Sequence, residues 1–69
     1  MSHTYITNII SSKSIVDSNT SSDFDKSMAW AKSSSMSGDL IVIREGYVGS
    51  DGVVDTYSDK DPITSWYRD

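Results

Sequence analysis

The stretch from Gly38 to Tyr57 constrains the fold of this chain more than any other part of it. Two runs rich in β-forming residues, Leu40–Val48 and Val53–Tyr57, flank the turn sequence Gly49-Ser50-Asp51-Gly52. This pattern predicts a β-hairpin. The first run is apolar on both of its alternating faces, which favours a central strand of a sheet. Gly46 within that run predicts a bulge or a sharp twist.

The N-terminal third contains a second candidate strand. Thr4–Ser11 holds several β-branched and aromatic residues and is bounded by serines, so we expect it to be a strand. Ser11–Ser22 is rich in serine, asparagine and threonine, whose side chains compete for backbone hydrogen bonds. We expect a connection there, with a short strand extension through Ser14–Val16 as the alternative.

One helix is expected over Asp23–Ser35. Ser22 precedes it as the expected N-cap, and Asp25 stands three residues later. Phe24, Met28 and Ala31 recur at helical spacing, which predicts a narrow stripe lying close against a sheet. Trp30 falls off the centre of this stripe and is expected at its boundary.

The C-terminal segment Ile63–Tyr67 has the composition of a strand. Asp61-Pro62 before it could instead cap a short helical turn. The expected fold is therefore a single α+β domain over residues 1–69, with the order β-α-β-β. One helix would pack on a three- or four-stranded mixed sheet, because a right-handed crossover would make the first two strands parallel. The opposite sheet face would stay exposed, and it is partly apolar.

Composition excludes several function classes. The 69 residues contain no cysteine and one histidine, which removes disulfides and the ordinary zinc sites. No apolar run is long enough to cross a membrane, and the N-terminal residues lack a signal-peptide pattern. We expect a cytoplasmic protein without a cofactor.

The charge is unevenly distributed along the chain. The net charge is −4. Residues 35–69 carry seven acids and three bases, whereas residues 1–34 carry three of each. An acidic surface repels nucleic acid and favours a basic partner. We therefore expect no direct contact with nucleic acid and none with membranes.

No motif for catalysis or metal binding is complete. Oxygen-bearing side chains have the alternate spacing of a calcium loop at Asp17, Asn19, Ser21, Asp23 and Asp25. Ser22 and Met28 replace the glycine and glutamate of such a loop. Glu45 and Asp55 lie in the expected hairpin with Arg44 nearby, which predicts an ion pair rather than an acid–base site. We expect no catalytic, cofactor-binding or metal-binding residue.

The remaining candidate is a protein-binding face in the C-terminal third. Acidic and aromatic residues alternate there, a pattern in which aromatic side chains anchor an interface and acids steer a basic partner. The residues that we expect to contact a partner are Asp51, Asp55, Tyr57, Asp59, Asp61, Trp66 and Tyr67. The alternative is that Tyr57 and Trp66 complete the core and the aspartates are only solvated.

These features favour a small acidic non-enzymatic binding protein. Its expected role is to occupy a basic surface of a larger protein, for example a surface that binds nucleic acid. Its size, its charge and its lack of catalytic motifs are typical of phage-encoded inhibitors of host defence, including anti-CRISPR proteins. The alternative is a structural or assembly module that forms a homodimer or larger assembly through the sheet edge or the exposed sheet face.

Overall fold

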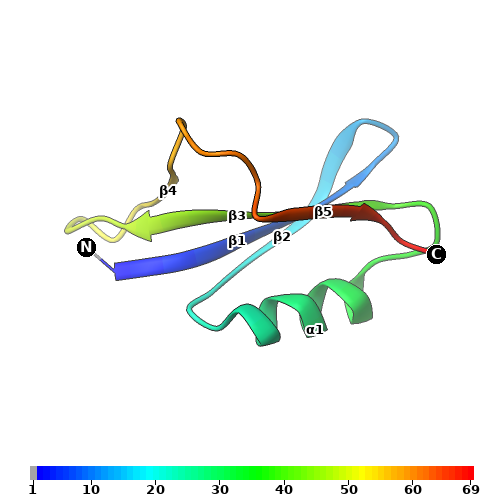
Figure 1. Cartoon of the computed structure of the whole chain (residues 1–69), viewed down its shortest axis with the longest axis horizontal. Helices are drawn as coiled ribbons and strands as arrows, with labels where there is room; N and C mark the ends of the chain where they lie inside the picture. Colours follow the sequence, from blue (N-terminus) through cyan, green and yellow to red (C-terminus); the bar gives the residue numbers. More distant parts are fainter. Residues whose placement is uncertain (1) are drawn as a thin grey trace.

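The computed structural model describes residues 2–69 and shows a curled antiparallel sheet with one helix on one face (Figure 1). The helix runs parallel to the long direction of the sheet in this view. In chain order the elements are β1 (Ser2–Ser11), β2 (Ser14–Ser21), α1 (Phe24–Ser34), β3 (Leu40–Val48), β4 (Val54–Thr56) and β5 (Thr64–Tyr67).

The expected β-α-β-β order and mixed sheet are wrong. Two strands precede the helix, and every strand pair is antiparallel. The spatial order is β2-β1-β3-β4, and β5 also pairs with β3. The helix therefore joins β2 to β3, which lie on either side of β1, and no adjacent parallel pair forms. The structure is mostly β, and the single helix is a minor part of it.

The error comes from β2, which lies in the segment expected to be a connection. The alternative, a short strand through Ser14–Val16, is confirmed, but β2 continues to Ser21. Ser12 and Lys13 have φ values of 51° and 68°, and Ser11 pairs with Ser14 across them. Two consecutive positive φ values are typical of the tight hairpin turn whose twist matches that of the strands. β2 is polar and largely exposed because it is an edge strand. A bulge leaves Val16 without a partner, since Ile9 pairs with Asp17 and Ile10 with Ile15.

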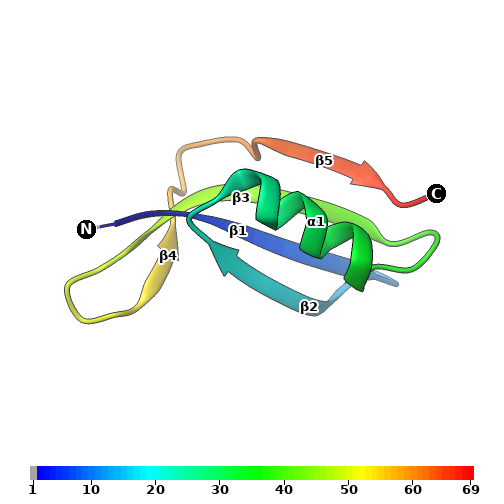
Figure 2. The same ribbon diagram turned by 90° about the horizontal axis from the view of Figure 1, so that it is seen from below.

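The helix begins one residue later than expected. Asp23, not Ser22, is the N-cap, and its carboxylate accepts hydrogen bonds from the backbone N–H groups of Asp25 and Lys26 at 2.9 and 3.2 Å. The view from below shows α1 in front of the sheet, running roughly along its strands (Figure 2). Its buried residues are Ser27 and Ala31.

The core lies between the helix and the sheet. Ile41 and Ile43 of β3 are fully buried with Ala31. Ile41 pairs with Ile9, and Ile43 pairs with Thr7, so these four side chains share the helix-facing side. The aromatic and methionine side chains packed against this core are Tyr5, Phe24, Met28, Trp30 and Trp66. Trp30 is partly buried and packs at the edge of this core, as its position off the centre of the helical stripe predicted.

β3 is a central strand over Leu40–Val48, as its two apolar faces predict. It pairs with β1 along its length and with β5 or β4 on its other side. The expected turn at its end is also present: the N–H of Gly52 donates to the carbonyl of Gly49 at 2.9 Å. β5 is a strand, which decides against the helical turn considered for Ile63–Tyr67.

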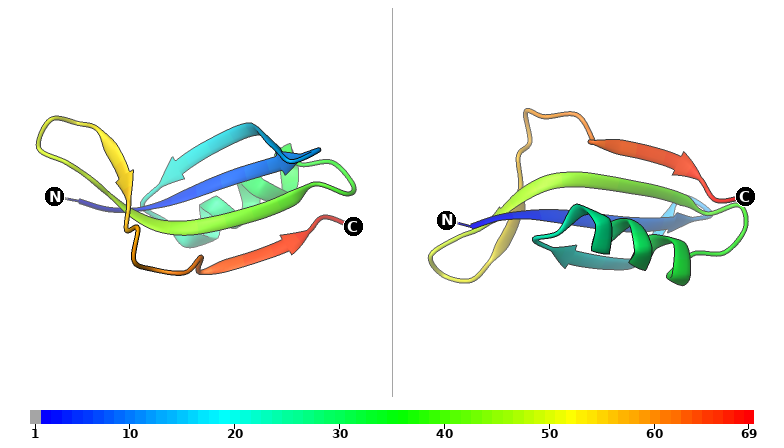
Figure 3. Two further views of the ribbon diagram at one scale, coloured as in Figure 1. Left: turned by 90° about the horizontal axis from the view of Figure 1, so that it is seen from above. Right: turned by 60° about the horizontal axis from the view of Figure 1, so that its bottom comes forward.

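The opposite face of the sheet is covered by β4 at one end, and of the described apolar residues on the rest of it only Val42 is buried. Beyond Gly46 the sheet curls, so that β4 lies across the end of β3, as the left view of Figure 3 shows. Thr4, which pairs with Gly46, is buried there. Within residues 2–69 no second layer covers the rest of this face. We call this surface the open face.

Candidate interaction site

Half of the acids of the chain belong to one part of the molecule. Asp51 lies in the β3–β4 turn, Asp55 on β4, and Asp59 and Asp61 in the connection to β5. Glu45 lies on the adjacent part of β3. We call these five residues, together with Lys60, the acidic end. The β3–β4 turn is the extreme left of Figure 1, beside the N-terminus.

The acidic end accounts for the whole net charge. Five acids and one lysine give 1 − 5 = −4, which equals the net charge of the chain. The other five acids and five bases cancel. The acids of this remainder are Asp17, Asp23, Asp25, Asp39 and Asp69, and its bases are Lys13, Lys26, Lys32, Arg44 and Arg68. The negative potential is therefore concentrated at one end of a molecule 37 Å long.

Two of these aspartates stabilise the local backbone and remain exposed. The Asp51 carboxylate accepts a hydrogen bond from the N–H of Val53 at 3.1 Å, and Asp55 accepts from the N–H of Thr56 at 3.0 Å. Each bond uses the Oδ1 atom. Across residues 2–69, no basic group lies within 4.0 Å of Asp51, Asp55, Asp59 or Asp61 to form an ion pair. Their charge is therefore available to a partner.

Glu45 forms the ion pairs of this region. Its Oε2 atom lies 3.2 Å from His3 Nε2 and 3.5 Å from Lys60 Nζ. The hydrogen bond from His3, followed by the charge of Lys60, lowers the pKa of the Glu45 carboxyl. The ion pair expected of Glu45 and Asp55 with Arg44 is wrong, because Glu45 pairs with His3 and Lys60 instead.

The aromatic residues of the expected binding face do not lie together. Tyr57 belongs to the acidic end: its ring centroid is 5.2 Å from that of Tyr47, and Lys60 Nζ lies 4.7 Å from the Tyr57 centroid. Trp66 pairs with Ile41 and faces the helix, where it packs on the core. Tyr67 pairs with Leu40 and lies on the open face, 71% exposed.

The binding face expected from the sequence is thus divided. Asp51, Asp55, Tyr57, Asp59 and Asp61 lie on the hairpin and on the connection that follows it. Trp66 and Tyr67 point to opposite faces of β5, because successive residues of a strand alternate. The expected order of acids and aromatics along the chain therefore does not make one continuous surface.

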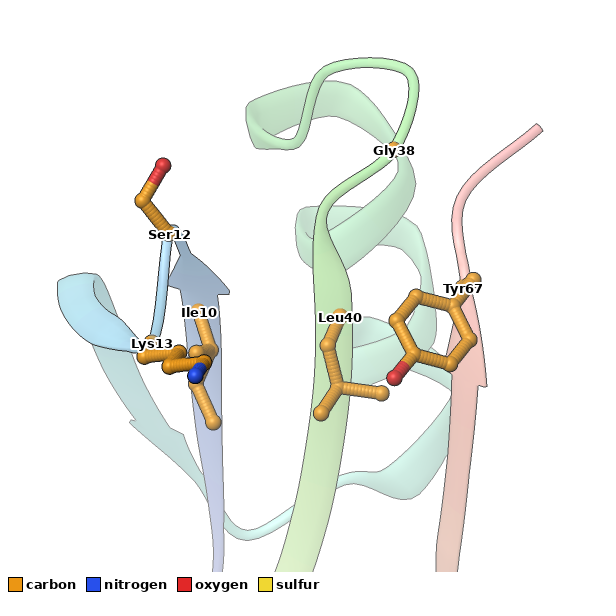
Figure 4. A pocket seen from close by; sticks show the side chains of 6 residues that line it. All are labelled: Ile10, Ser12, Lys13, Gly38, Leu40 and Tyr67. Carbon is orange, nitrogen blue, oxygen red and sulfur yellow. The ribbon is translucent and has the colours of Figure 1, made fainter.

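The open face carries a second surface, of which only Tyr67 was among the expected site residues. A hollow of about 240 Å³ lies where the β1–β2 turn, β3 and β5 meet, as Figure 4 shows. Its lining residues are Ile10, Ser12, Lys13, Gly38, Leu40 and Tyr67. The apolar side chains on both faces of β3 indicated an exposed patch. The sequence did not indicate that Lys13 lies at this hollow, because its position depends on the β1–β2 hairpin turn, which was not predicted.

No other cluster in the described part of the chain suggests chemistry. Over residues 2–69, no three histidine, aspartate or glutamate side chains lie close enough together to hold a metal ion. In the same range, no helix is long and apolar enough to cross a bilayer.

The fold and its surfaces define a small antiparallel β protein with one helix, a charged end and a partly uncovered sheet face. Comparisons with protein-family models, with curated proteins and with solved structures found no match for the chain. Any assignment of function therefore depends on the surfaces themselves.

Proposed function

We infer that this chain is a non-enzymatic binding protein whose acidic end occupies a basic surface of a larger protein. The observation that carries this proposal is the segregation of charge. The acidic end holds the whole net charge of −4, and its four aspartates lack basic partners within residues 2–69. Unpaired surface carboxylates contribute little to folding, and their mutual repulsion opposes it.

The partner is expected to carry clustered lysine or arginine side chains. A field concentrated at one end of an elongated molecule speeds encounter with an oppositely charged surface and orients the approach. Protein surfaces that bind nucleic acid phosphates have this character. The function proposed is thus inhibition by occupation of such a surface, which is similar to that of small phage-encoded inhibitors of host defence such as anti-CRISPR proteins.

Tyr57 supplies apolar contact area, which the aspartates of the acidic end do not. It is half-buried beside Tyr47 and in the middle of the acidic residues. Aromatic side chains held by neighbours lose little conformational freedom on binding and often dominate the binding energy. We expect Asp51, Asp55, Asp59 and Asp61 to set the association rate and Tyr57 to set the dissociation rate. Trp66 is not part of the proposed contact, because it is partly buried and packs on the core.

The test compares two variants of equal charge. One replaces Asp55, Asp59 and Asp61 by Asn, and the matched control replaces Asp17, Asp25 and Asp69, which lie outside the acidic end. Proteins from the native host are captured on the wild type and on both variants and are quantified by mass spectrometry. A partner that binds the wild type and the control but not the acidic-end variant supports the proposal.

The kinetics of that partner then decide the mechanism. Surface plasmon resonance at two salt concentrations should show slower association for the acidic-end variant and a weaker dependence on salt. Equal association rates for the acidic-end variant and the wild type at both salts would overturn the proposal.

A further inference from the structure

The hollow on the open face has apolar walls and one cation. Ile10 and Leu40 form its floor, and Tyr67 stands at one side (Figure 4). Lys13 is the only charged residue among those that line it. Within residues 2–69, Lys13 makes no ion pair. A group that suits this hollow would therefore be apolar and would carry a negative charge beside it.

The position of Lys13 is set by an unusual turn. Ser12 and Lys13 both adopt positive φ, a conformation that glycine and asparagine accept more readily than serine or lysine. The turn nonetheless directs Lys13 along β1, so that its side chain lies over Ile10 in Figure 4. Two non-glycine residues in this conformation store backbone strain, and they place an ammonium group at the mouth of the hollow.

The other end of the molecule carries a group of the matching kind. The β3–β4 turn exposes the carboxylate of Asp51 next to the side chain of Val53, which is 58% exposed. The hydrogen bond to the N–H of Val53 fixes Asp51 through Oδ1, which leaves Oδ2 without a bond in the turn. We call residues 50–53 the acidic tip. The acidic tip and the β1–β2 turn lie at opposite ends of the long direction in Figures 1 and 2.

We propose that the acidic tip of one copy of this chain docks into the Lys13 hollow of a second copy. The carboxylate of Asp51 pairs with the ammonium of Lys13, and Val53 contacts Ile10, Leu40 and Tyr67. Because the two contact surfaces are different and lie at opposite ends, the contact is head-to-tail and can repeat to form a chain or a ring. This association goes beyond the proposed function and needs no other protein.

The charges of the open face disfavour the two-fold alternative. Arg44 pairs with Ile6 and so lies on the open face, where it is half-buried. It makes no ion pair within residues 2–69. Two open faces placed against each other would bring cations together without an acid between them, which costs free energy. A head-to-tail contact instead places the negative end of one copy at a cation of the next.

The experiment is analytical ultracentrifugation of the pure protein at low and high salt. The weight-average mass should rise between about 20 μM and about 1 mM protein, the range expected for a small contact. It should rise more at about 20 mM salt than at about 0.5 M salt, because salt screens exposed charge pairs. A protein that stays monomeric throughout this range at both salts overturns the proposal.

Charge variants identify the contact. Lys13→Glu and Asp51→Asn should each weaken association about fivefold or more, and Asp51→Asn retains a side-chain oxygen for the bond to Val53. The control Lys26→Glu, on the exposed side of the helix, changes the same charge and should associate like the wild type. Circular dichroism verifies that each variant is folded. Equal weakening by Lys13→Glu and Lys26→Glu would mean that only net charge matters, and the specific contact would be rejected.

A mixing experiment tests the head-to-tail geometry. Lys13→Glu retains an intact acidic tip, and Asp51→Lys retains an intact hollow, so a mixture of the two variants contains one wild-type contact and one reversed pair. The mixture should associate more strongly than either variant alone. No gain on mixing would overturn the pairing. Since Lys13 lies outside the acidic end, Lys13→Glu should leave capture of a basic partner unchanged, which separates this proposal from the proposed function.

Discussion

The side chain of Ile6 occupies the space that a side chain at Gly46 would need. A Cβ atom at residue 46 would lie 2.5 Å from Ile6 Cδ1 and 2.5 Å from the carbonyl oxygen of Asp55. Both distances are well below van der Waals contact. Glycine at this position therefore lets β3 curl, so that β4 and Ile6 can approach its backbone.

Gly46→Ala should destabilise the protein by about 1–3 kcal/mol, the usual cost of overpacking. Chemical denaturation followed by circular dichroism measures the change in the free energy of unfolding. Ile6→Ala in the same background should recover part of the loss, because it removes one of the two clashes. The carbonyl of Asp55 cannot move without breaking the β3–β4 pairing, so the recovery should be incomplete. A Gly46→Ala protein as stable as the wild type would contradict the described curl.

Ile41→Ala and Ile43→Ala should each cost about 2–5 kcal/mol, because both side chains are fully buried beneath the helix. The core of so small a domain rarely supplies more than about 3–5 kcal/mol, so either variant should lose a large part or all of its stability. Val53→Ala is the matched control on an exposed apolar residue and should change stability by less than about 0.5 kcal/mol. Thermal denaturation of the three variants provides the comparison.

Glu45 should contribute stability that depends on pH. Its pKa is lower in the folded state than in the unfolded chain, where a glutamate titrates at about 4.3. The contribution is therefore complete above that unfolded value and is lost as the pH falls through the folded pKa. The difference in melting temperature between wild type and Glu45→Gln should shrink as the pH is lowered from the unfolded value to below the folded-state pKa of Glu45.

The same carboxyl can be observed directly. His3→Ala removes the largest cause of the shift, so the pKa of Glu45 should move upward towards its ordinary value. Carbon-detected nuclear magnetic resonance titration of the Glu45 carboxyl measures this change. An unchanged pKa would show that the hydrogen bond from His3 does not form in solution.

Replacing Asp55, Asp59 and Asp61 by Asn should leave the melting temperature nearly unchanged. These acids are exposed and form no ion pairs within residues 2–69, and surface substitutions of this kind change stability by less than about 0.5 kcal/mol each. Asparagine at residue 55 retains an oxygen that can accept from the N–H of Thr56. Differential scanning calorimetry gives the comparison, and a large loss of stability would mean that the carboxylates support the fold itself.

The parts of the fold that could be predicted are those where local pattern and tertiary position agree. β3 is apolar on both faces because it is central, and the turn at Gly49–Gly52 has the residues that such turns require. The helix lies within one residue of its expected bounds at each end. In these segments burial, propensity and turn chemistry all favour the same structure.

The length of β2 beyond Val16 could not be predicted, because its strand character there comes from pairing with β1. Its serines, asparagine and threonine have the composition of a loop, and its turn residues Ser12 and Lys13 are unusual at positive φ. Pairing with β1 supplies the backbone hydrogen bonds that composition does not indicate. This one strand changes the topology from mixed to antiparallel.

The candidate site was predicted in part for a similar reason. The acids of residues 51–61 remain together because they are close in the sequence. Trp66 and Tyr67 point to opposite faces because successive strand residues alternate, but the topology decides which of the two faces the helix. The hollow beside Lys13 joins three segments that lie far apart in the chain, and a local pattern cannot indicate such a site.

The pairing of β1 with β3 has a consequence for how quickly the chain folds. Their contacts join residues separated by 30 positions, from Ile10 to Leu40, up to 46 positions, from Ser2 to Val48. The β1–β2 hairpin, the helix and the β3–β4 hairpin can form from nearby residues, but the β1–β3 pairing cannot. The core residues of β3 are absent until the second half of the chain is being synthesised. Chains dominated by such distant contacts fold in milliseconds to seconds, more slowly than helical proteins of equal length. Until β3 pairs with it, one edge of β1 stays unpaired. In that interval β1 can most easily pair with a strand of another copy of the chain.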